Sequence, residues 1–360
     1  MVKTVEYTRL GKADLKGNIG QRVFLNFLAR DVSVRLQKDK VTKFIVFNMV
    51  DKDIAVEARL FGANDAMIEL IQEGKVYDAA VDIKPYEKSP DGFSCIIYNI
   101  DNSSVPPEQF ADWAPNLDVC KQVIEAVLTE HIETIYFQIT YPIVVKYWER
   151  LSTWSAAKSQ HHTQLGGLLK HTTEVVQISG VLTDYFNSIY GENFIDKALV
   201  QCAAILHDVG KTLEYDVDTV SGKTDYSGHS ILSTHIMDIL SIVEVQAYKL
   251  GIGQPKNSDD TEEEQCDIKP RESIDSEAEA LSLLKHCLAA HHGKLEYGSP
   301  IVASIPEAYV LHMADMLSAA MFKFDKVLRS IEPGEWTSSW TNGELTKYYK
   351  DSNKTDDIEV

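Results

Sequence analysis

The stretch Ile205-Leu206-His207-Asp208-Val209-Gly210-Lys211 ends an apolar run that begins at Ala198. Adjacent histidine and aspartate are unusual in that position, because both side chains are costly to bury without a partner. A bound divalent metal ion would remove this cost, since imidazole and carboxylate are both good ligands for such ions. A helix that ends in a solvated His-Asp-Gly turn explains the dipeptide equally well, so the rest of the chain must decide between the two interpretations.

The histidines of the chain are concentrated around this stretch. Of 11 histidines only His131 precedes residue 160, and Asp315 adds an acidic residue on the apolar segment 308–317. The order of His171, His207-Asp208 and Asp315 resembles that of the HD metal-dependent phosphohydrolase superfamily. The remaining histidines are His161, His162, His229, His235, His286, His291, His292 and His312. Of these, His229 and the His291-His292 pair match the extra ligands of the two-metal branch of that superfamily.

Charge is distributed unevenly along the chain. The formal net charge of -19 argues against a protein that coats nucleic acid indiscriminately. Residues 1–60 nevertheless hold 12 lysines and arginines against 7 acidic residues. A length of 360 residues predicts two domains, and the hydrophobic content of 44% is enough for a substantial core.

Features of membrane and secreted proteins are absent from the sequence. It contains no run of about 18 apolar residues, so no membrane span is expected. Its first residues lack the apolar stretch of a secretory signal peptide. The cysteines are odd in number, widely spaced and without a C-x-x-C pattern: Cys95, Cys120, Cys202, Cys266 and Cys287. We therefore expect structural thiols, a reducing compartment and a cytoplasmic location.

The N-terminal part has the pattern of a small barrel. A polar arm over residues 1–18 precedes a segment, 19–105, in which apolar and polar residues alternate as in strands. Strands are predicted at 23–35, 42–50, 54–61, 76–86 and 93–100, with a helix over 62–73 and a turn over 88–92. Five short strands with a helix between the third and the fourth fit an OB-fold barrel.

An OB fold binds single-stranded nucleic acid through a basic groove and aromatic platforms. The candidate phosphate contacts are Arg22, Arg30, Arg35, Lys38, Lys40 and Lys43. Phe44, Phe47 and Phe61 are available aromatic residues, and strand alternation places Phe44 and Phe47 on opposite faces without deciding which faces outward. A purely structural barrel, with its phenylalanines in the core, is the alternative.

Beyond a Pro-rich linker over residues 106–118 the periodicity becomes helical, and it predicts an all-α domain over 119–345. Pro142 is expected to break or begin a helix. Residues 216–226 are expected to form a loop, 251–277 a disordered acidic insertion, and 346–360 a loose polar tail. The fold class is therefore a multidomain α and β protein, with a five-stranded OB-fold barrel followed by an all-helical HD domain.

Several motifs together resemble one family within the superfamily. They are Ala156-Ala157-Lys158, His161-His162, Gly166-Gly167-Leu168-Leu169-Lys170-His171-Thr172, the central stretch 205–211, Gly228-His229, and His291-His292-Gly293-Lys294-Leu295-Glu296-Tyr297-Gly298-Ser299-Pro300. Over residues 20–330 the chain resembles the YhaM family of bacterial 3′–5′ exoribonucleases, which join an N-terminal OB fold to an HD domain. The chain departs from the family pattern at two places. Asp225-Tyr226-Ser227 stands where a Gly-x-Leu sequence is expected, and the acidic insertion over 251–277 is longer than usual.

The resemblance implies a ligand set for up to two metal ions per chain. His171, His207, Asp208 and Asp315 would hold one ion. Asp208 has two oxygens and could bridge to a second ion held by His229 and one or both of His291 and His292. The resemblance points to Mn, while a mixed histidine and carboxylate site also suits Fe, Co, Ni or Zn.

The remaining candidate residues have less specific roles. Asp208 and Lys211 are the catalytic candidates, with Lys211 near the charge that develops on phosphate. Substrate contact is expected for His161 and His162, although a structural role explains them equally well. His235 and His286 are interpreted as helix-surface or packing histidines. His312 is interpreted as a packing residue, with support of a metal ligand as the alternative.

These expectations combine into one functional hypothesis. We expect a metal-dependent 3′–5′ exonuclease that hydrolyses single-stranded RNA, or DNA, to nucleoside monophosphates. One alternative is an HD phosphohydrolase acting on free nucleotides or cyclic dinucleotides, and another is a non-catalytic protein that binds single strands. No membrane partner is expected, and a homo-oligomer remains open.

Overall fold

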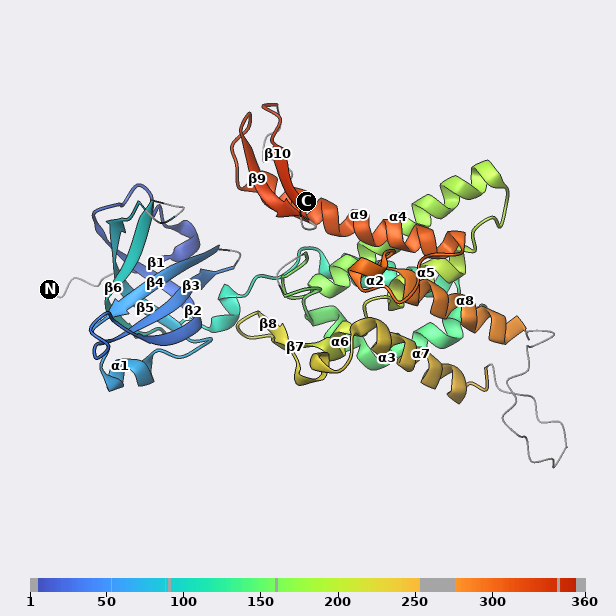
Figure 1. Ribbon diagram of the computed structural model, residues 1–360, viewed down its shortest axis with the longest axis horizontal. Helices are drawn as coiled ribbons and strands as arrows, with labels where there is room; N and C mark the ends of the chain where they lie inside the picture. Colours follow the sequence, from blue (N-terminus) through green and yellow to red (C-terminus); the bar gives the residue numbers. More distant parts are fainter. Residues whose placement is uncertain are drawn as a thin grey trace. The chain divides into compact units, whose positions relative to one another are not determined.

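The computed structural model describes residues 6–52, 54–87, 89, 92–158, 161–252, 276–341 and 344–353 (Figure 1). The chain divides into two compact units. The barrel unit consists of Met1–Trp113 and Val217–Thr224, and the helical unit consists of Ala114–Asp216 and Asp225–Val360. Most of the expected acidic insertion and the end of the expected tail lie outside the described residues.

The barrel unit is a closed sheet with the strand order of an OB fold. Strands β2, β3 and β4 form an antiparallel meander, β4 pairs in parallel with β6, and β5 pairs with both β6 and β2 to close the barrel. This confirms the predicted fold class. The elements are β2 (Arg22–Leu36), β3 (Lys43–Asp51), β4 (Ile54–Phe61), α1 (Asp65–Leu70), β5 (Val76–Pro85) and β6 (Phe93–Asn102).

Side-chain alternation along β3 decides which phenylalanine faces outward. Phe47 is buried in the barrel core, where its ring stacks on Phe27 with centroids 5.9 Å apart. Phe44 lies on the other face, directly across from the exposed Phe61 of β4, and the two rings stack at 5.5 Å. An aromatic pair therefore remains on the outer surface of the barrel.

The barrel differs from its sequence prediction in three details. A short strand, β1 (Thr8–Arg9), pairs in parallel with β2 and is followed by η1 (Leu10–Lys12), so part of the expected arm joins the sheet. The helix is shorter than predicted, because Asn64 caps its N-terminus by accepting a hydrogen bond from the Met67 amide. The predicted strand 23–35 is interrupted by a bulge inside β2 that begins at Arg30, with Asp31 at φ 56°.

The helical unit is built around α5, which packs against α3, α4, α8 and α9. From Leu199 to Leu206 every residue of this helix is buried, so its partners cover it on all sides. The helices are α2 (Leu117–Glu130), α3 (Ile135–Thr153), α4 (Gly167–Tyr190), α5 (Lys197–Leu206), α6 (Lys211–Glu214), α7 (His235–Lys249), α8 (Ser276–Ala290) and α9 (Pro306–Arg329), with short turns η2 (Pro107–Phe110), η3 (Gly228–Ile231) and η4 (Leu295–Tyr297).

Two hairpins correct the expectation of an all-helical domain. The segment expected to be a loop is the hairpin of β7 (Tyr215–Asp218) and β8 (Lys223–Tyr226), whose tip groups with the barrel unit. A second hairpin joins β9 (Trp336–Thr341) to β10 (Glu344–Tyr349), so residues 346–349 belong to a strand and not to a tail. Tyr348 anchors this hairpin, because it is buried and packs edge-on against Phe324 of α9.

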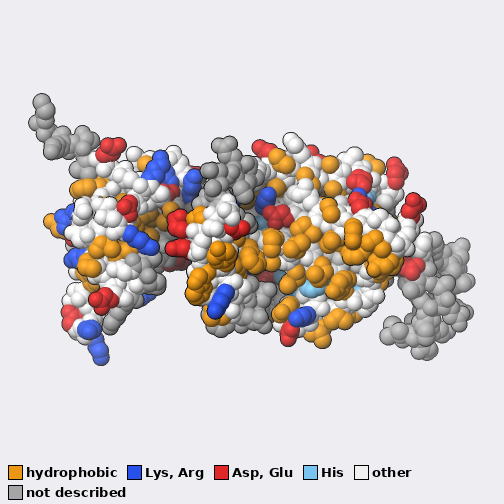
Figure 2. All heavy atoms as spheres, turned by 90° about the horizontal axis from the view of Figure 1, so that it is seen from above, with side chains coloured by type: hydrophobic (Ala, Val, Ile, Leu, Met, Phe, Trp, Pro, Cys, Tyr) orange, Lys and Arg blue, Asp and Glu red, His pale blue; other side chains and the backbone are white. Residues whose placement is uncertain are grey.

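The outer side of α9 carries a row of exposed apolar side chains, about one per helical turn: Tyr309, Met313, Leu317, Met321 and Phe324. Hydrophobic side chains are gathered on the face of the helical unit seen in Figure 2. Among the described residues, no helix combines the length with the apolarity that crossing a bilayer requires. A homo-oligomer stays an open prediction.

Candidate metal centre

The C-terminal end of α5 carries His207 and Asp208 into the interior of the helical unit, where the exposed fraction of their side chains is 0% and 2%. The interpretation of this segment as a solvated turn is therefore wrong. Gly210 follows because nothing larger fits: a Cβ atom there would lie 2.1 Å from the backbone carbonyl oxygen of His235. The glycine thus allows the start of α7 to lie against the end of α5.

A first cluster forms around His171 of α4. Its Nε2 atom lies 3.1 Å from Asp315 Oδ1, 3.2 Å from His207 Nε2 and 3.4 Å from Asp208 Oδ2. The ligand atoms of His171, His207 and Asp315 all lie within 4.8 Å of one another. The consecutive helices α4 and α5 and the sequence-distant helix α9 therefore bring the predicted ligands of one ion together.

The hydrogen bonds of the two imidazoles show that this cluster suits a cation. His207 Nδ1 donates to the carbonyl of Ala204 at 2.7 Å. His171 Nδ1 lies 2.9 Å from Ser318 Oγ, whose own hydroxyl donates to Glu174, so the imidazole is the donor. Both Nε2 atoms then present lone pairs to each other and to two carboxylates, an arrangement that a divalent ion stabilises.

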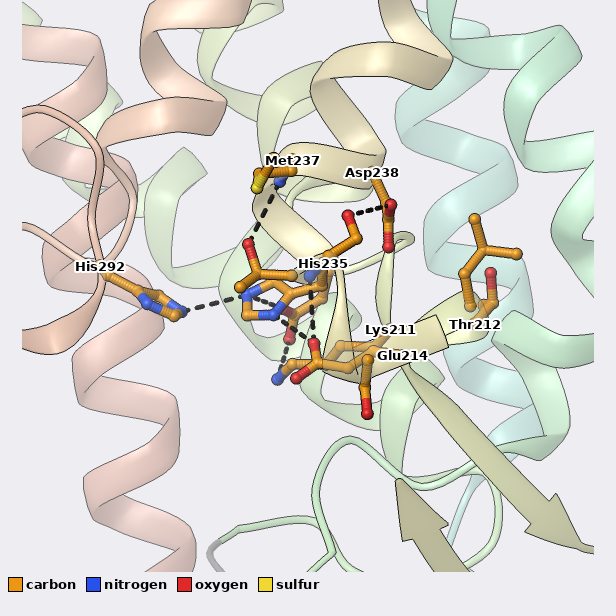
Figure 3. A network of polar contacts seen from close by, with 12 residues as sticks. Lys211, Thr212, Glu214, His235, Met237, Asp238 and His292 are labelled. Atoms are coloured by element: carbon orange, nitrogen blue, oxygen red, sulfur yellow. Dashed lines mark hydrogen bonds and ion pairs between the residues drawn. The ribbon is translucent and has the colours of Figure 1, made fainter. Parts of the chain in front are cut away.

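A second cluster is formed by His235, His291 and His292, whose ligand atoms also lie within 4.8 Å of one another. His235 Nδ1 is 2.5 Å from Glu214 Oε2, and its Nε2 is 3.3 Å from His292 Nε2 (Figure 3). His292 Nδ1 donates to the Tyr297 carbonyl, so the facing Nε2 atoms again lack a proton between them. His291 Nε2 is buried without a hydrogen-bond partner among the described residues.

Asp208 lies between the two clusters, with one carboxylate oxygen toward each. Its Oδ2 is 3.4 Å from the Nε2 atoms of both His171 and His207, and its Oδ1 is 3.8 Å from His235 Nε2. This is the placement expected of a carboxylate that bridges two ions. The residues present therefore fit two metal ions that share Asp208.

The charge state of these groups also suits metal binding. Burial works to raise the pKa of Asp208, but Lys211, whose Nζ is 2.8 Å from Oδ2, and the neighbouring imidazoles hold that pKa well below its usual range. Burial lowers the pKa of both His171 and His291. Burial also works to lower the pKa of His207, but the neighbouring Asp208 carboxylate raises it above its usual value. An ionised Asp208 and neutral His171 and His291 are in the protonation states that metal ions require.

The second cluster contains a histidine other than the one predicted. His229 lies in the turn before α7, has a side chain 47% exposed, and pairs with Asp238 Oδ1 at 2.9 Å. His235, interpreted from the sequence as a surface or packing residue, takes the position expected for His229. The reason is the packing of α7 on Gly210, which turns the first residue of that helix toward Asp208.

The paired histidines predicted to contact substrate lie beside the first cluster. The ring of His161 is 4.9 Å from that of His171. His162 is 2% exposed, with its ring packed on Phe322 and its Nε2 3.3 Å from Glu174, which is typical of a structural role. The structure brings both near the centre, while their contact with substrate stays a prediction.

His312 and His286 have backbone partners. His312 Nδ1 donates to the carbonyl of His291 at 2.8 Å, and its ring covers Gly293, where a Cβ would lie 2.3 Å away. His312 therefore supports the segment that carries the second cluster, in addition to packing. His286 accepts a hydrogen bond from the Ser304 amide, in agreement with a packing role.

Three supporting residues were not identified from the sequence: Ser318, Glu174 and Glu214. Burial works to raise the pKa of both glutamates, but hydrogen bonds from His162 and Ser318 lower that of Glu174, and His235 lowers that of Glu214. Ser318 follows Asp315 by three residues on α9, and Glu174 follows His171 by three on α4. This helical spacing could have suggested both, because residues three apart share a helix face.

The predicted basic residues of the barrel are exposed, with one exception. Arg35 and Lys43 flank the loop between β2 and β3, and Lys38 and Lys40 lie within it. Arg22 is paired with Asp82 at 2.5 Å and stacks on Tyr98. Arg30 is partly buried, and its guanidinium donates to the carbonyl of Ser221, which removes it from an open groove.

The helical unit matches a known protein family. Residues 168–320 match the family described as HD domain. This range contains every ligand of both clusters, and an HD domain implies dependence on a divalent metal. The helical unit therefore contains an HD domain.

The whole chain is homologous to proteins named 3′–5′ exoribonuclease YhaM, which confirms the resemblance. That of Bacillus velezensis is 24% identical over 95% of this chain and 98% of its own length. The Bacillus subtilis protein is 26% identical over 69% of each chain, and the Listeria innocua protein 28% over 65% of this chain and 64% of its own. A solved replication protein A heterotrimer bound to ssDNA matches with a TM-score of 0.22 and 16% identity, over 30% of this chain and 27% of that one, too weakly to bear on the fold.

Proposed function

We propose that this protein is a metal-dependent 3′–5′ exoribonuclease that releases nucleoside monophosphates from single-stranded RNA. The observation that carries the proposal is the pair of histidine clusters that share Asp208, in a chain homologous along 95% of its length to a protein named as such an enzyme. We place its action in the cytoplasm, because RNA is the proposed substrate and the cysteines of the described residues are free thiols, as in a reducing compartment.

The residues of the centre have defined tasks in this reaction. Bound divalent ions supply Lewis acidity toward a phosphodiester and lower the pKa of water. His171, His207 and Asp315 would hold one ion and His235, His291 and His292 would hold the other, with one carboxylate oxygen of Asp208 toward each cluster. Lys211, held 2.8 Å from Asp208 Oδ2, keeps a positive charge where negative charge develops on the phosphoryl oxygens.

The family resemblance points to manganese, and the first cluster is compatible with it, since that cluster combines imidazole with the carboxylates of Asp208 and Asp315. The second cluster consists of three imidazoles, which also suit Fe, Co, Ni or Zn. We therefore propose manganese as the activating metal, with the second position less selective.

The outer surface of the barrel supplies the proposed contacts with RNA. In the sheet register Arg35 lies across from Phe44, and Phe44 lies across from Phe61, so a cation and a stacked aromatic pair form one row. Bases stack on aromatic rings whatever their sequence, and cations contact the phosphates. Lys38, Lys40 and Lys43 extend the row with positive charge.

The test is digestion of a 5′-labelled single-stranded RNA with Mn²⁺, with the products sized over time. The wild-type chain should shorten the RNA from its 3′ end in steps of one nucleotide. Asp208→Asn keeps the shape but removes the bridging charge, so it should reduce the rate by about a thousandfold or more and bind fewer ions, while still binding RNA. Asp184→Asn, the same change at an exposed carboxylate of α4 that pairs with Lys197, is the control.

Digestion by Asp208→Asn at the wild-type rate would contradict the proposed mechanism. Hydrolysis of free nucleotides without digestion of RNA would favour the alternative phosphohydrolase activity. Binding of RNA without any hydrolysis, in the presence of Mn²⁺, would favour the non-catalytic alternative.

A further inference from the structure

The two clusters differ in the hydrogen bonds that the Nδ1 atoms of His171 and His235 make on the side away from the other ligands. In the first, His171 Nδ1 donates to Ser318 Oγ at 2.9 Å, and the serine hydroxyl donates to Glu174 Oε2 at 2.7 Å. Ser318 is 1% exposed and His171 is fully buried, so water does not compete for the hydrogen bond between them, while the Glu174 carboxylate is partly exposed. The hydroxyl thus links a carboxylate on α4 to an imidazole on the same helix through α9.

In the second cluster the carboxylate contacts the imidazole directly. Glu214 Oε2 lies 2.5 Å from His235 Nδ1 and also accepts a hydrogen bond from the His235 amide at 3.2 Å. Glu214 ends α6, and His235 begins α7, so this pair also fixes the start of α7 (Figure 3). The other two imidazoles of the cluster donate to backbone carbonyls.

We propose that Ser318 with Glu174, and Glu214, are positioning residues that each control the affinity of one cluster for its ion and leave the other cluster unchanged. The inference rests on the proposed function, because it concerns the metal ions of the same centre. A hydrogen bond to Nδ1 fixes the tautomer and orientation of a ligating imidazole and raises its basicity. Since the two supports share no residue, removing one should affect one ion only.

The test is titration of metal-free protein with Mn²⁺, followed by calorimetry, for the wild type and single variants. The wild type should take up two ions. Ser318→Ala and Glu174→Gln should each weaken one of the two binding steps by about 10- to 100-fold, and Glu214→Gln should weaken the other by a similar factor.

Matched controls separate positioning from general damage. Ser179→Ala removes another fully buried serine hydroxyl of the helical unit, one that donates to the Val176 carbonyl. Asp238→Asn neutralises another carboxylate that contacts an imidazole, that of His229. Both controls should keep the two wild-type affinities.

A second background assigns each support to its cluster. Asp315→Asn removes a ligand of the first cluster and should leave one strong ion. Adding Ser318→Ala should leave the affinity for the remaining ion unchanged, because both changes act on the first cluster. Adding Glu214→Gln should weaken binding of the remaining ion by about 10- to 100-fold, because this residue acts on the second cluster.

Two results would overturn the inference: affinities of Ser318→Ala and Glu214→Gln equal to those of their controls, or an equal loss at both steps in either variant. If these occur while the wild type still binds two ions and digests RNA, only this inference fails. A wild-type chain that takes up no Mn²⁺ and digests no RNA would remove the proposed function as well.

Discussion

His229 and His235 show that the partners of a histidine, more than its place in the chain, decide its chemistry. Both lie close to the start of α7, and each has a carboxylate oxygen close by, at 2.9 Å and 2.5 Å. His229 uses its Nε2 for Asp238 at the protein surface, whereas His235 uses its Nδ1 for Glu214 and keeps Nε2 for the second cluster. The nitrogen that makes the hydrogen bond therefore decides the role: His229 is an ion-paired residue, whereas His235 is a candidate metal ligand.

Replacing these two histidines tests the assignment. His235→Ala removes one of three imidazoles from the second cluster, so the bound Mn²⁺ should fall from two ions per chain to one, with RNA digestion reduced about a hundredfold. His229→Ala should keep both ions. The metal content is measured after equilibrium dialysis, and loss of an ion from His229→Ala but not from His235→Ala would reverse the assignment.

Helix packing brings the ligands together, and Gly210 allows the start of α7 to approach the end of α5 closely enough for this. Gly210 has φ -58°, which any residue can adopt, so the need for glycine comes from the neighbouring carbonyl of His235 alone.

Pro142 lies inside a helix although proline normally interrupts one. Helix α3 runs from Ile135 to Thr153 with this proline inside it, so the expectation that it breaks or begins a helix was wrong. Burial of neighbouring residues such as Ile139 and Ile143 holds the helix together despite the missing amide donor.

Gly210→Ala should separate α5 from α7. The added Cβ would lie 2.1 Å from a backbone oxygen, which cannot rotate away, so overpacking should cost about 1–3 kcal/mol of the free energy of unfolding. That loss corresponds to a fall in melting temperature of several degrees, at about 2–4 °C per kcal/mol for a domain of this size. Calorimetry of the metal-free protein measures it.

Gly228→Ala provides the control, because no atom lies within 4 Å of the position of its added Cβ. Its melting temperature should match that of the wild type. Equal melting temperatures for Gly210→Ala and Gly228→Ala would show that α7 adjusts freely, contrary to the packing argument.

At the scale of the whole chain, we propose that RNA binding and hydrolysis are divided between the two units. The barrel carries the exposed cations Arg35, Lys38, Lys40 and Lys43 beside an aromatic pair, and the HD domain carries the histidine clusters. The described ligands of both metal clusters all belong to the helical unit, so changes to the barrel cations should leave the metal centre intact. On this proposal a long RNA would need both units, while a small phosphodiester would need the HD domain alone.

Replacing Arg35, Lys38, Lys40 and Lys43 together by alanine should weaken RNA binding and reduce its salt dependence by a slope of about 0.7 for each phosphate that the protein no longer neutralises. Binding is measured in the Asp208→Asn background, which prevents digestion. In the otherwise wild-type chain, digestion of long RNA should slow, while hydrolysis of a small chromogenic phosphodiester continues.

The matched control replaces three lysines and one arginine that are exposed on the helical unit: Lys146, Lys249, Lys326 and Arg329. This control removes the same positive charge, and the salt dependence of its RNA binding should stay closer to that of the wild type than the barrel variant's does. Equal slopes and digestion rates for the barrel variant and the wild type would show that these residues do not contact RNA.

Local pattern was sufficient to predict the architecture and most of the centre. Alternation predicted the barrel strands, because a strand with one buried face must alternate, and the spacing of apolar residues predicted the helices. His207, Asp208 and Asp315 stood out, because polar residues on apolar segments need a partner, and the resemblance to the HD superfamily added His171 to the ligand set. Their mutual contact is seen in the first cluster.

Contacts between segments distant in sequence decided the rest. His235 was chosen over His229 by the approach of α7 to Gly210, and Phe44 was placed outside the barrel by the burial of Phe47. Ser318 and Glu174 became partners of His171 because α9 packs against α4. Such choices depend on the distance and direction between side chains of separate elements, which follow from tertiary packing and not from the order of residues along one segment.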